Sequence, residues 1–278
     1  METMNSLLLN TDGVQVPQLG FGVWQVPSDV AEQVVTTALE VGYRHVDTAS
    51  AYGNEEGVGR AVRASGIPRE KLFVTTKLFN PDHGRAEEAF DESLSRLGLD
   101  YVDLYLIHWP LPEHGTYMQA WRSLEKIYRQ GRAKAIGVSN FTVETLTRVI
   151  DEAEITPSIN QIELHPYFQQ RRMREFHEAN GILTEAWSPL GQGQGLLGDP
   201  ALAVLSEKYG KTPAQIVLRW HIQLGNVVIP KSVTPARIKE NFGVFDFVLD
   251  AEDMTAIGAM NTTDGRIGPD PDTFHWMG

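Results

Sequence analysis

Short apolar segments rich in β-branched residues alternate with longer segments of helical period along the whole chain. Eight of the short segments have the length and composition of β-strands. They are residues 20–24, 44–47, 72–77, 102–108, 135–139, 158–163, 183–187 and 227–230. A helical pattern follows each one, and eight such units predict an α/β fold of the (β/α)₈ TIM-barrel type. A doubly wound parallel sheet is the alternative, because it has the same local alternation.

Local signals place the helices between these strands. Asp29 and Glu32 form a capping-box pattern at the start of the first helix. Thr212, Pro213 and Gln215 suit the N-cap, N1 and N3 positions of a later one. The predicted helices are 30–41, 55–65, 85–97, 118–130, 143–152, 171–180, 212–224, one starting at Thr234-Pro235, and 251–260. The last one exceeds the eight units, and we expect it to pack outside the barrel.

The N-terminal segment predicts a β-hairpin. Residues 7–10 and 14–17 are strand candidates, and Asp12-Gly13 between them is a turn signal. In a barrel, this hairpin would cover the closed end.

Composition restricts the class of protein. The chain has 278 residues and a mass of 31.0 kDa, which suits a single barrel domain over 1–278. Its 24 basic and 36 acidic residues give a net charge of −12, which argues against nucleic-acid partners and a polybasic membrane anchor. The absence of cysteine excludes thiolate chemistry and disulfides. No segment approaches ~18 apolar residues and the first ten residues lack a basic signal-peptide region. We expect a cytoplasmic monomer.

Polar or aromatic side chains stand at the carboxyl end of seven of the eight predicted strands. They are Asp47, Lys77, His108, Ser139, Asn140, Gln161, Glu163, Trp187, Ser188, Lys231 and Ser232. In a barrel these strand ends form one rim, where active sites lie. The side chains are therefore expected to converge on one site.

Four of the residues suit proton transfer to a carbonyl oxygen. Lys77 would be partly buried, and Asp47 on the neighbouring strand can supply its counter-charge. Tyr52 follows Asp47 by five residues, close enough to fold back over the rim. A lysine ammonium beside a tyrosine hydroxyl is expected to lower the tyrosine pKa and make it a better general acid. His108 can donate a hydrogen bond to a substrate oxygen.

A phosphate site is predicted after the eighth strand. A helix starting at Thr234 presents free N–H groups, and Lys231, Ser232 and Arg237 cluster around it. Asn241, a turn further on, can reach an adenine. The literal G-x-G-x-x-G at Gly193, Gly195 and Gly198 lacks the βαβ context of a Rossmann fingerprint, and we interpret it as a glycine loop.

Aromatic residues predict where flat ligands lie. Trp187, at a strand end, offers a face for stacking a ring such as a nicotinamide. Trp24, Phe79 and Trp109 fall in rim loops and are expected to form an apolar substrate wall. The tail from 266 onward has little helical or strand pattern and contains two aromatic residues that could anchor it.

Taken together, these residues and their surrounding segments resemble the aldo-keto reductase family. The matching blocks are 42–49 (GYRHVDTA), 52–55 (YGNE), 76–77 (TK), 102–110 (VDLYLIHWP), 137–141 (GVSNF), 160–166 (NQIELHP), 188–191 (SPLG) and 229–232 (IPKS). Residues 191–193 (GQG) and 244–247 (VFDF) resemble the bacterial 2,5-diketo-D-gluconate reductases in particular.

The resemblance implies a metal-free, NADPH-dependent carbonyl reductase in which Tyr52 donates the proton, Lys77 and Asp47 tune it, and His108 orients the carbonyl. It also implies a set of cofactor-binding residues. These are Ser139, Asn140, Gln161 and Trp187 at the nicotinamide, Ser188, Leu190 and Gly191 at the pyrophosphate, Lys231, Ser232 and Arg237 at the 2′-phosphate, and Asn241 near the adenine. In this family such tails fold over the pocket and help to set specificity.

Two other classes of function stay open. One is a non-catalytic NADPH-binding sensor or regulatory subunit of the same fold, against which the four intact catalytic residue types argue. The other is a metal-dependent barrel hydrolase, for which the eight histidines are too scattered. His165 with Glu163 is a weak candidate ligand pair, and His221 is interpreted as a core residue.

Overall fold

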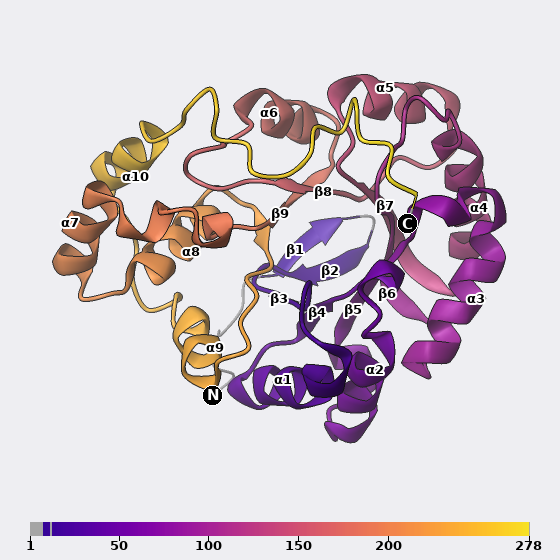
Figure 1. Ribbon diagram of the computed structural model, residues 1–278, viewed down its shortest axis with the longest axis horizontal. Helices are drawn as coiled ribbons and strands as arrows, with labels where there is room; N and C mark the ends of the chain where they lie inside the picture. Colours follow the sequence, from indigo (N-terminus) through magenta and orange to yellow (C-terminus); the bar gives the residue numbers. More distant parts are fainter. Residues whose placement is uncertain (1–7, 12, 278) are drawn as a thin grey trace.

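The computed structural model describes residues 8–11 and 13–277 and contains a parallel sheet of eight strands surrounded by helices (Figure 1). The strands are β3 (Phe21–Gly22), β4 (His45–Asp47), β5 (Phe73–Leu78), β6 (Val102–Ile107), β7 (Ala133–Ser139), β8 (Ile159–Glu163), β9 (Leu183–Trp187) and β10 (Val227–Val228). All eight predicted strands are confirmed. The first and last are only two residues long.

The sheet closes on itself through a seam between its first and last strands. Val228 N–H donates to the Gln18 carbonyl (2.8 Å), and Gly20 N–H donates to the Val228 carbonyl (2.8 Å). Gly22 N–H then donates to the Pro230 carbonyl (3.1 Å). These bonds make the sheet a barrel, so the doubly wound alternative is wrong.

The helices follow the strands in the predicted order. They are α1 (Ser28–Val41), α2 (Glu55–Ala64), α3 (Ala86–Leu97), α4 (Tyr117–Arg129), α5 (Val143–Glu152), α6 (Arg171–Ala179), α7 (Pro200–Tyr209), α8 (Pro213–Gln223), α9 (Pro235–Phe242) and α10 (Ala251–Gly258). None of the described helices is long and apolar enough to cross a membrane.

The predicted helix caps have mixed outcomes. The Thr212–Gln215 capping box of α8 is confirmed. The box predicted for Asp29 and Glu32 is wrong, because α1 begins one residue before Asp29 and has no side-chain cap. Asp29 lies within the first turn, where its charge still favours the helix dipole. The Glu32 carboxylate instead pairs with the Arg60 guanidinium (2.6 Å).

The sequence reasoning missed helix α7. The sequence marks the start of this helix with Asp199-Pro200. The Asp199 carboxylate accepts a hydrogen bond from the Ala201 N–H (2.8 Å), and Pro200 occupies the first turn. The start of α9 also differs from expectation. Thr234 provides no side-chain cap, and its N–H donates to the Ser232 hydroxyl instead (3.1 Å).

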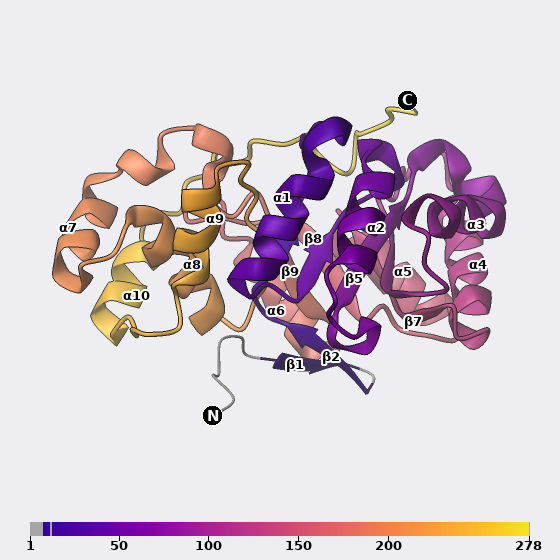
Figure 2. The same cartoon turned by 90° about the horizontal axis from the view of Figure 1, so that it is seen from below.

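The hairpin of β1 (Leu8–Thr11) and β2 (Val14–Pro17) pairs in antiparallel register, from Leu8 opposite Pro17 to Thr11 opposite Val14. Leu7 and Asp12 of the prediction lie outside the described residues. Figure 2 places the hairpin at the end of the barrel opposite the C-terminal tail. Val16 is fully buried with lumen-facing side chains that form a core separate from the strand–helix core. The expectation of a closed lower end is therefore confirmed.

A polar layer lies above this apolar floor. His45, Thr75 and Glu185 are all fully buried there. His45 Nδ1 lies 3.3 Å from the Pro17 carbonyl and its Nε2 lies 3.2 Å from the Thr75 hydroxyl. The barrel therefore carries titratable groups between its floor and its rim. His221, on α8, is fully buried, as expected of a core residue.

Candidate active site

Lys77 and Asp47 form a buried ion pair at the carboxyl ends of β5 and β4. Lys77 Nζ donates to Asp47 Oδ1 (2.6 Å) and to the Thr48 carbonyl (2.9 Å). The side chains of Lys77 and Asp47 are 0% and 2% exposed. Gln161, on β8, donates from Nε2 to the other carboxylate oxygen of Asp47 (2.8 Å). A buried ammonium needs such partners, because an unpaired charge away from water is costly.

Tyr52 completes this group from the loop after β4, at the end of the 3₁₀ turn η1 (Ser50–Tyr52). Lys77 Nζ lies 3.4 Å from the Tyr52 hydroxyl and 5.0 Å from its ring centroid. The His108 ring meets the Tyr52 ring edge-on at 5.6 Å. The four predicted catalytic side chains are therefore brought together.

Asn54 fixes the loop that carries Tyr52. Its Oδ1 accepts from the Thr48 hydroxyl (2.8 Å), and its Nδ2 donates to the carbonyls of Val23 (2.9 Å) and Val26 (3.0 Å). Asn54 is 1% exposed, so these bonds form away from water. The sequence reasoning assigned it no role, because its Val23 and Val26 partners are remote in the chain.

The direction of the Tyr52 pKa shift differs from the sequence-based expectation. Burial raises the pKa of Tyr52 above 10, and Asp47 and Glu185 act in the same direction, whereas the Lys77 ammonium lowers it. The net shift is upward, so the predicted lowering is wrong. The hydroxyl is consequently protonated at neutral pH and is available as a donor.

Lys77 and His108 are shifted in opposite directions. Burial is the largest single influence and opposes the charge of Lys77, but Asp47, Tyr52 and Glu185 together outweigh it, so the Lys77 pKa is raised. Burial, helped by the nearby Lys77 charge, holds the pKa of His108 well below 6.5. At neutral pH the site therefore holds an ammonium, a neutral imidazole and a neutral phenol.

Four predicted cofactor residues form one network beside this group. Asn140 Nδ2 donates to the His108 carbonyl (3.0 Å) and to the Ser139 hydroxyl (3.0 Å), and its Oδ1 accepts from Trp187 Nε1 (2.8 Å). Ser139 donates to the Gln161 carbonyl (2.9 Å). Asn140 adopts a left-handed backbone (φ 62°), a strain typical of functional positions. Trp187 is partly exposed, which leaves ring surface for a ligand.

The loop after β9 turns sharply. Ser188 (φ 49°) and Gly191 (φ 68°) both have left-handed backbones. Leu190 lies between them and is partly exposed. Two short turns follow, η4 (Gly191–Gly193) and η5 (Leu196–Gly198), so the glycine motif forms no Rossmann loop.

The start of α9 gathers unpaired positive charge. Lys231 and Arg237 are exposed, and neither forms an ion pair with a described residue. Ser232 and Asn241 are 8% and 5% exposed. In a chain of net charge −12, two unpaired cations beside helical N–H groups suit a phosphate.

The predicted pocket wall is partly assembled by the tail. Phe274 packs on Trp109 (4.2 Å between ring centroids) and Trp276 packs on Phe79 (5.3 Å). Trp24 is 42% exposed and makes no ring contact with another described residue. The structure thus joins Phe79 and Trp109 to the tail and leaves Trp24 apart.

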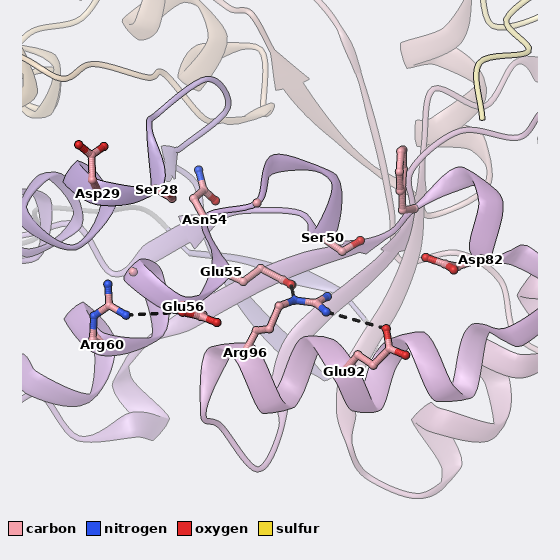
Figure 3. Close-up of a pocket in the computed structure, with 13 residues that line it drawn as sticks. Ser28, Asp29, Ser50, Asn54, Glu55, Glu56, Arg60, Asp82, Glu92 and Arg96 are labelled. Atoms are coloured by element: carbon pink, nitrogen blue, oxygen red, sulfur yellow. Dashed lines mark hydrogen bonds and ion pairs between the residues drawn. The ribbon is translucent and has the colours of Figure 1, made fainter. Parts of the chain in front are cut away.

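A polar cavity of about 550 Å³ lies beside the site (Figure 3). Ser50 and Phe79 line it, but the four residues of the Tyr52 group do not. Arg96 crosses it between the carboxylates of Glu55 (2.7 Å) and Glu92 (3.9 Å). Glu55 also accepts from the Thr76 hydroxyl (2.5 Å), so these charges connect α2 and α3 to β5.

The candidate metal ligands have other partners. The Glu163 carboxylate accepts from the N–H groups of Ile267 (2.6 Å) and Gly268 (2.7 Å), and His165 Nε2 lies 3.0 Å from it. Among residues 8–11 and 13–277, no group of three or more side chains of the ligating types is placed to hold a metal ion.

Known proteins of one family resemble the chain over most of its length. A sequence profile of the aldo/keto reductase family matches residues 18–262. An aldo-keto reductase of Mycolicibacterium smegmatis is 52% identical over 277 residues, covering 99% of this chain and 100% of the relative. The methylglyoxal reductase DkgA of Escherichia coli (strain K12) is 52% identical over 264 residues, covering 95% and 96%.

Solved structures agree with this. An aldo/keto reductase from Brucella melitensis is 54% identical, with a TM-score of 0.90 over 94% of this chain and 100% of its own. A variant of Gox0644 in complex with NADPH is 47% identical, with a TM-score of 0.94 over 98% and 99%. The chain belongs to the aldo-keto reductase family.

Proposed function

We propose that the protein reduces aldehyde and ketone carbonyls to alcohols with NADPH. The observation that carries this proposal is the Tyr52 hydroxyl, 3.4 Å from an ammonium that is itself neutralised by Asp47 at 2.6 Å. Such an arrangement supplies a proton to an oxygen that gains negative charge.

NADPH supplies the hydride that reduces the carbonyl carbon. Tyr52 holds the proton that the forming alkoxide takes from its hydroxyl oxygen. Lys77 stabilises the negative charge that this transfer leaves on Tyr52, and solvent later restores the proton. His108, neutral at physiological pH, donates an N–H to the carbonyl oxygen and orients it. Asp47 holds Lys77 in place through its 2.6 Å contact with the ammonium.

The chain's residues fit NADPH. Lys231, Ser232 and Arg237 would hold the 2′-phosphate, with Asn241 near the adenine. Ser188, Leu190 and Gly191 would lie along the pyrophosphate. Ser139, Asn140 and Gln161 would hold the nicotinamide against Trp187. The unpaired cations at α9 are the structural support for this assignment, since NADH lacks the phosphate that they would bind. Gox0644 was solved with NADPH, which also favours it.

We infer that the substrate is a small, uncharged dicarbonyl. Phe79 and Trp109, joined by the tail's aromatic rings, make a wall suited to apolar groups. A relative at 52% identity is named methylglyoxal reductase, which supports this class. 2,5-Diketo-D-gluconate, after which the reductases that residues 191–193 and 244–247 resemble are named, is the second candidate. A comparison of kcat/KM for the two substrates decides between them, and the higher value identifies the preferred one.

The proposal is tested by NADPH oxidation with methylglyoxal, 2,5-diketo-D-gluconate and an aromatic aldehyde. We expect turnover with at least one, and a loss of about 10²–10⁴-fold in kcat for Tyr52→Phe, because the phenyl ring lacks the proton. Lys126→Ala, on the outer helix α4, is the control and should be unaffected.

NADPH binding by Tyr52→Phe, measured by tryptophan fluorescence, should equal that of the wild type. Full activity of Tyr52→Phe would overturn the role of the tyrosine. Tight NADPH binding without turnover of any carbonyl would instead favour the sensor.

Three expectations from the sequence accompany this proposal. We propose a single domain over 1–278, a monomer and a cytoplasmic location. Ultracentrifugation tests the second and cell fractionation the third.

A further inference from the structure

The tail strap, residues 266–277, is clipped to the barrel by one buried carboxylate. Ile267 N–H donates to Glu163 Oε1 (2.6 Å) and Gly268 N–H donates to Glu163 Oε2 (2.7 Å). Glu163 is 2% exposed and ends β8. Two consecutive N–H groups on one carboxylate form a charge-assisted, bidentate contact, which is stronger than ordinary backbone hydrogen bonds.

These two hydrogen bonds from Ile267 and Gly268 to Glu163, called the clip below, also hold the strap against the indole of Trp187. A Cβ on Gly268 would lie 2.5 Å from Trp187 Cη2 and 2.9 Å from Glu163 Oε2, so only glycine fits between the ring edge and the carboxylate. The neighbouring Arg266 guanidinium lies over the Phe168 ring at 4.7 Å. Residues 266–268 are therefore held at three successive positions.

The far end of the strap is held across the barrel mouth. Asn80 Nδ2 donates to the Trp276 carbonyl (2.9 Å), and the Trp276 and Phe274 rings pack on Phe79 and Trp109. Figure 1 shows the strap, in yellow, running from the side of α6 and β8 to the side of α4. One end thus contacts the proposed cofactor platform, and the other contacts the proposed substrate wall.

We propose that Glu163 is a positioning residue that couples the proposed cofactor platform to the proposed substrate wall. Its two hydrogen bonds make the strap and Trp187 one unit. Binding of NADPH on Trp187 and closure of the strap over the carbonyl therefore stabilise each other. This inference rests on the proposed function. The coupling must be reciprocal, because each ligand shifts the same equilibrium between clipped and released strap.

Glu163→Gln breaks the clip with little change of volume, since the amide offers one acceptor where two N–H groups need one each. We expect the KM for the carbonyl to rise about tenfold, with kcat within a factor of three. A catalytic role for Glu163 would lower kcat instead.

Hydrogen exchange of the strap amides provides a readout apart from activity. In the wild type, NADPH should slow the exchange of residues 267 and 268 at least threefold. In Glu163→Gln, their exchange should be faster without cofactor and insensitive to NADPH.

Two further variants of the strap make the test decisive. Gly268→Ala disrupts the clip from the tail side and leaves Glu163 intact, so it should reproduce both effects even if Glu163→Gln fails to fold. Phe274→Ala loosens only the far end. It should raise KM while NADPH still slows exchange at 267 and 268.

The proposal is overturned if NADPH leaves exchange at 267 and 268 unchanged in the wild type, or if both clip variants keep the wild-type KM. Absence of NADPH-dependent turnover in the wild type would refute the proposed function alone, because the exchange measurement still reports on the clip.

Discussion

Glu185 is the least satisfied polar residue of the barrel interior. Both carboxylate oxygens are buried without a hydrogen-bond partner among the described residues, and the His45 Nε2 atom lies 3.7 Å from one of them. Burial, reinforced by the charge of Asp47, raises the pKa of Glu185 to about 8. Burial lowers the pKa of His45 to about 4. At pH 7 both groups are neutral, which explains how they share a lumen with the Asp47–Lys77 pair.

The raised pKa of Glu185 determines whether stability rises or falls with pH, and unfolding measurements can check this direction. The folded state holds the Glu185 proton up to a pH of about 8, whereas the unfolded chain releases it near 4.5. Through Glu185, the free energy of unfolding therefore falls by up to about 1.4 kcal/mol per pH unit as the pH rises through that window. Glu185→Gln, which mimics the protonated form, should gain at least about 1 kcal/mol relative to the wild type between pH 5 and pH 8.5 in urea unfolding.

Glu207→Gln is the matched control, since Glu207 is exposed and unpaired among the described residues. The loss of this exposed carboxylate should change stability little. A Glu185→Gln variant whose stability difference from the wild type stays the same across this pH range would show that Glu185 is already ionised.

The residue types of the site could be predicted from the sequence, but their protonation could not. Strand ends placed Asp47, Lys77 and His108 on one rim, because parallel strands in a barrel share a direction. The pKa of Tyr52 depends on how far its loop buries it, and Asn54 sets that through carbonyls of the segment after β3. Contacts of that kind leave no local pattern in a sequence.

At the scale of elements, the start of α9 is expected to decide which nicotinamide cofactor is used. Arg237→Ala should raise the Kd for NADPH about tenfold and leave the Kd for NADH unchanged, because an exposed charge-assisted contact to a phosphate is lost. Isothermal titration measures both.

Lys239→Ala is the control on the same helix, since a side chain two residues further along an α-helix points about 200° away. A loss of affinity for NADH as large as that for NADPH would show that Arg237 supports the fold of α9 rather than a 2′-phosphate.

The packing of α2 on α3 depends on one glycine. A Cβ on Gly59 would lie 2.6 Å from the carbonyl carbon of Leu97, where α3 ends. Gly59→Ala should therefore destabilise the protein by about 1–3 kcal/mol, although alanine favours helices in isolation.

Gly84→Ala serves as the comparison, because nothing lies within 4 Å of its added Cβ and it should change stability little. The melting temperatures of the two variants, measured by thermal unfolding, test this prediction. Equal melting temperatures would show that α2 can shift away from α3 without cost.

Elements were predictable where their signals are local. Buried apolar runs located all eight strands, and Thr212 with Gln215 located the start of α8. The short lengths of β3 and β10 could not be predicted, because strand pairing at a barrel seam depends on how the whole sheet closes. α7 was missed although Asp199-Pro200 marks its start, since its apolar residues show weak helical periodicity.

At the scale of the whole molecule, buried neutral histidines set the acid limit of stability. Burial lowers the pKa of His45 and His83 to about 4, and that of His177 and His221 to about 3. The unfolded chain binds these protons near pH 6.5, so the stabilising effect of the neutral folded forms is lost as the pH falls from 6.5 toward 3.

We expect the free energy of unfolding, measured by denaturant titration, to fall steeply between about pH 6.5 and pH 4. Each of the four histidines contributes up to about 1.4 kcal/mol per pH unit. His221→Gln should flatten the slope by about one histidine's share. A slope unchanged in that variant would show that His221 is not neutral in the folded state.

Long-range contacts of the strap were beyond reach of the sequence. Glu163 and Gly268 are separated by 105 positions, and neither is unusual locally. Only the folded barrel shows that a β8 carboxylate faces the tail.

The barrel seam also constrains how the protein is made. The first strand finds its second partner only when residues 228–230 have left the ribosome, about 200 residues after β3. At ordinary rates of translation this takes about 10–40 s. Until then the nascent sheet has an open edge that other chains can pair with. During synthesis, the segment around Phe21 is therefore the surface that chaperones would need to shield.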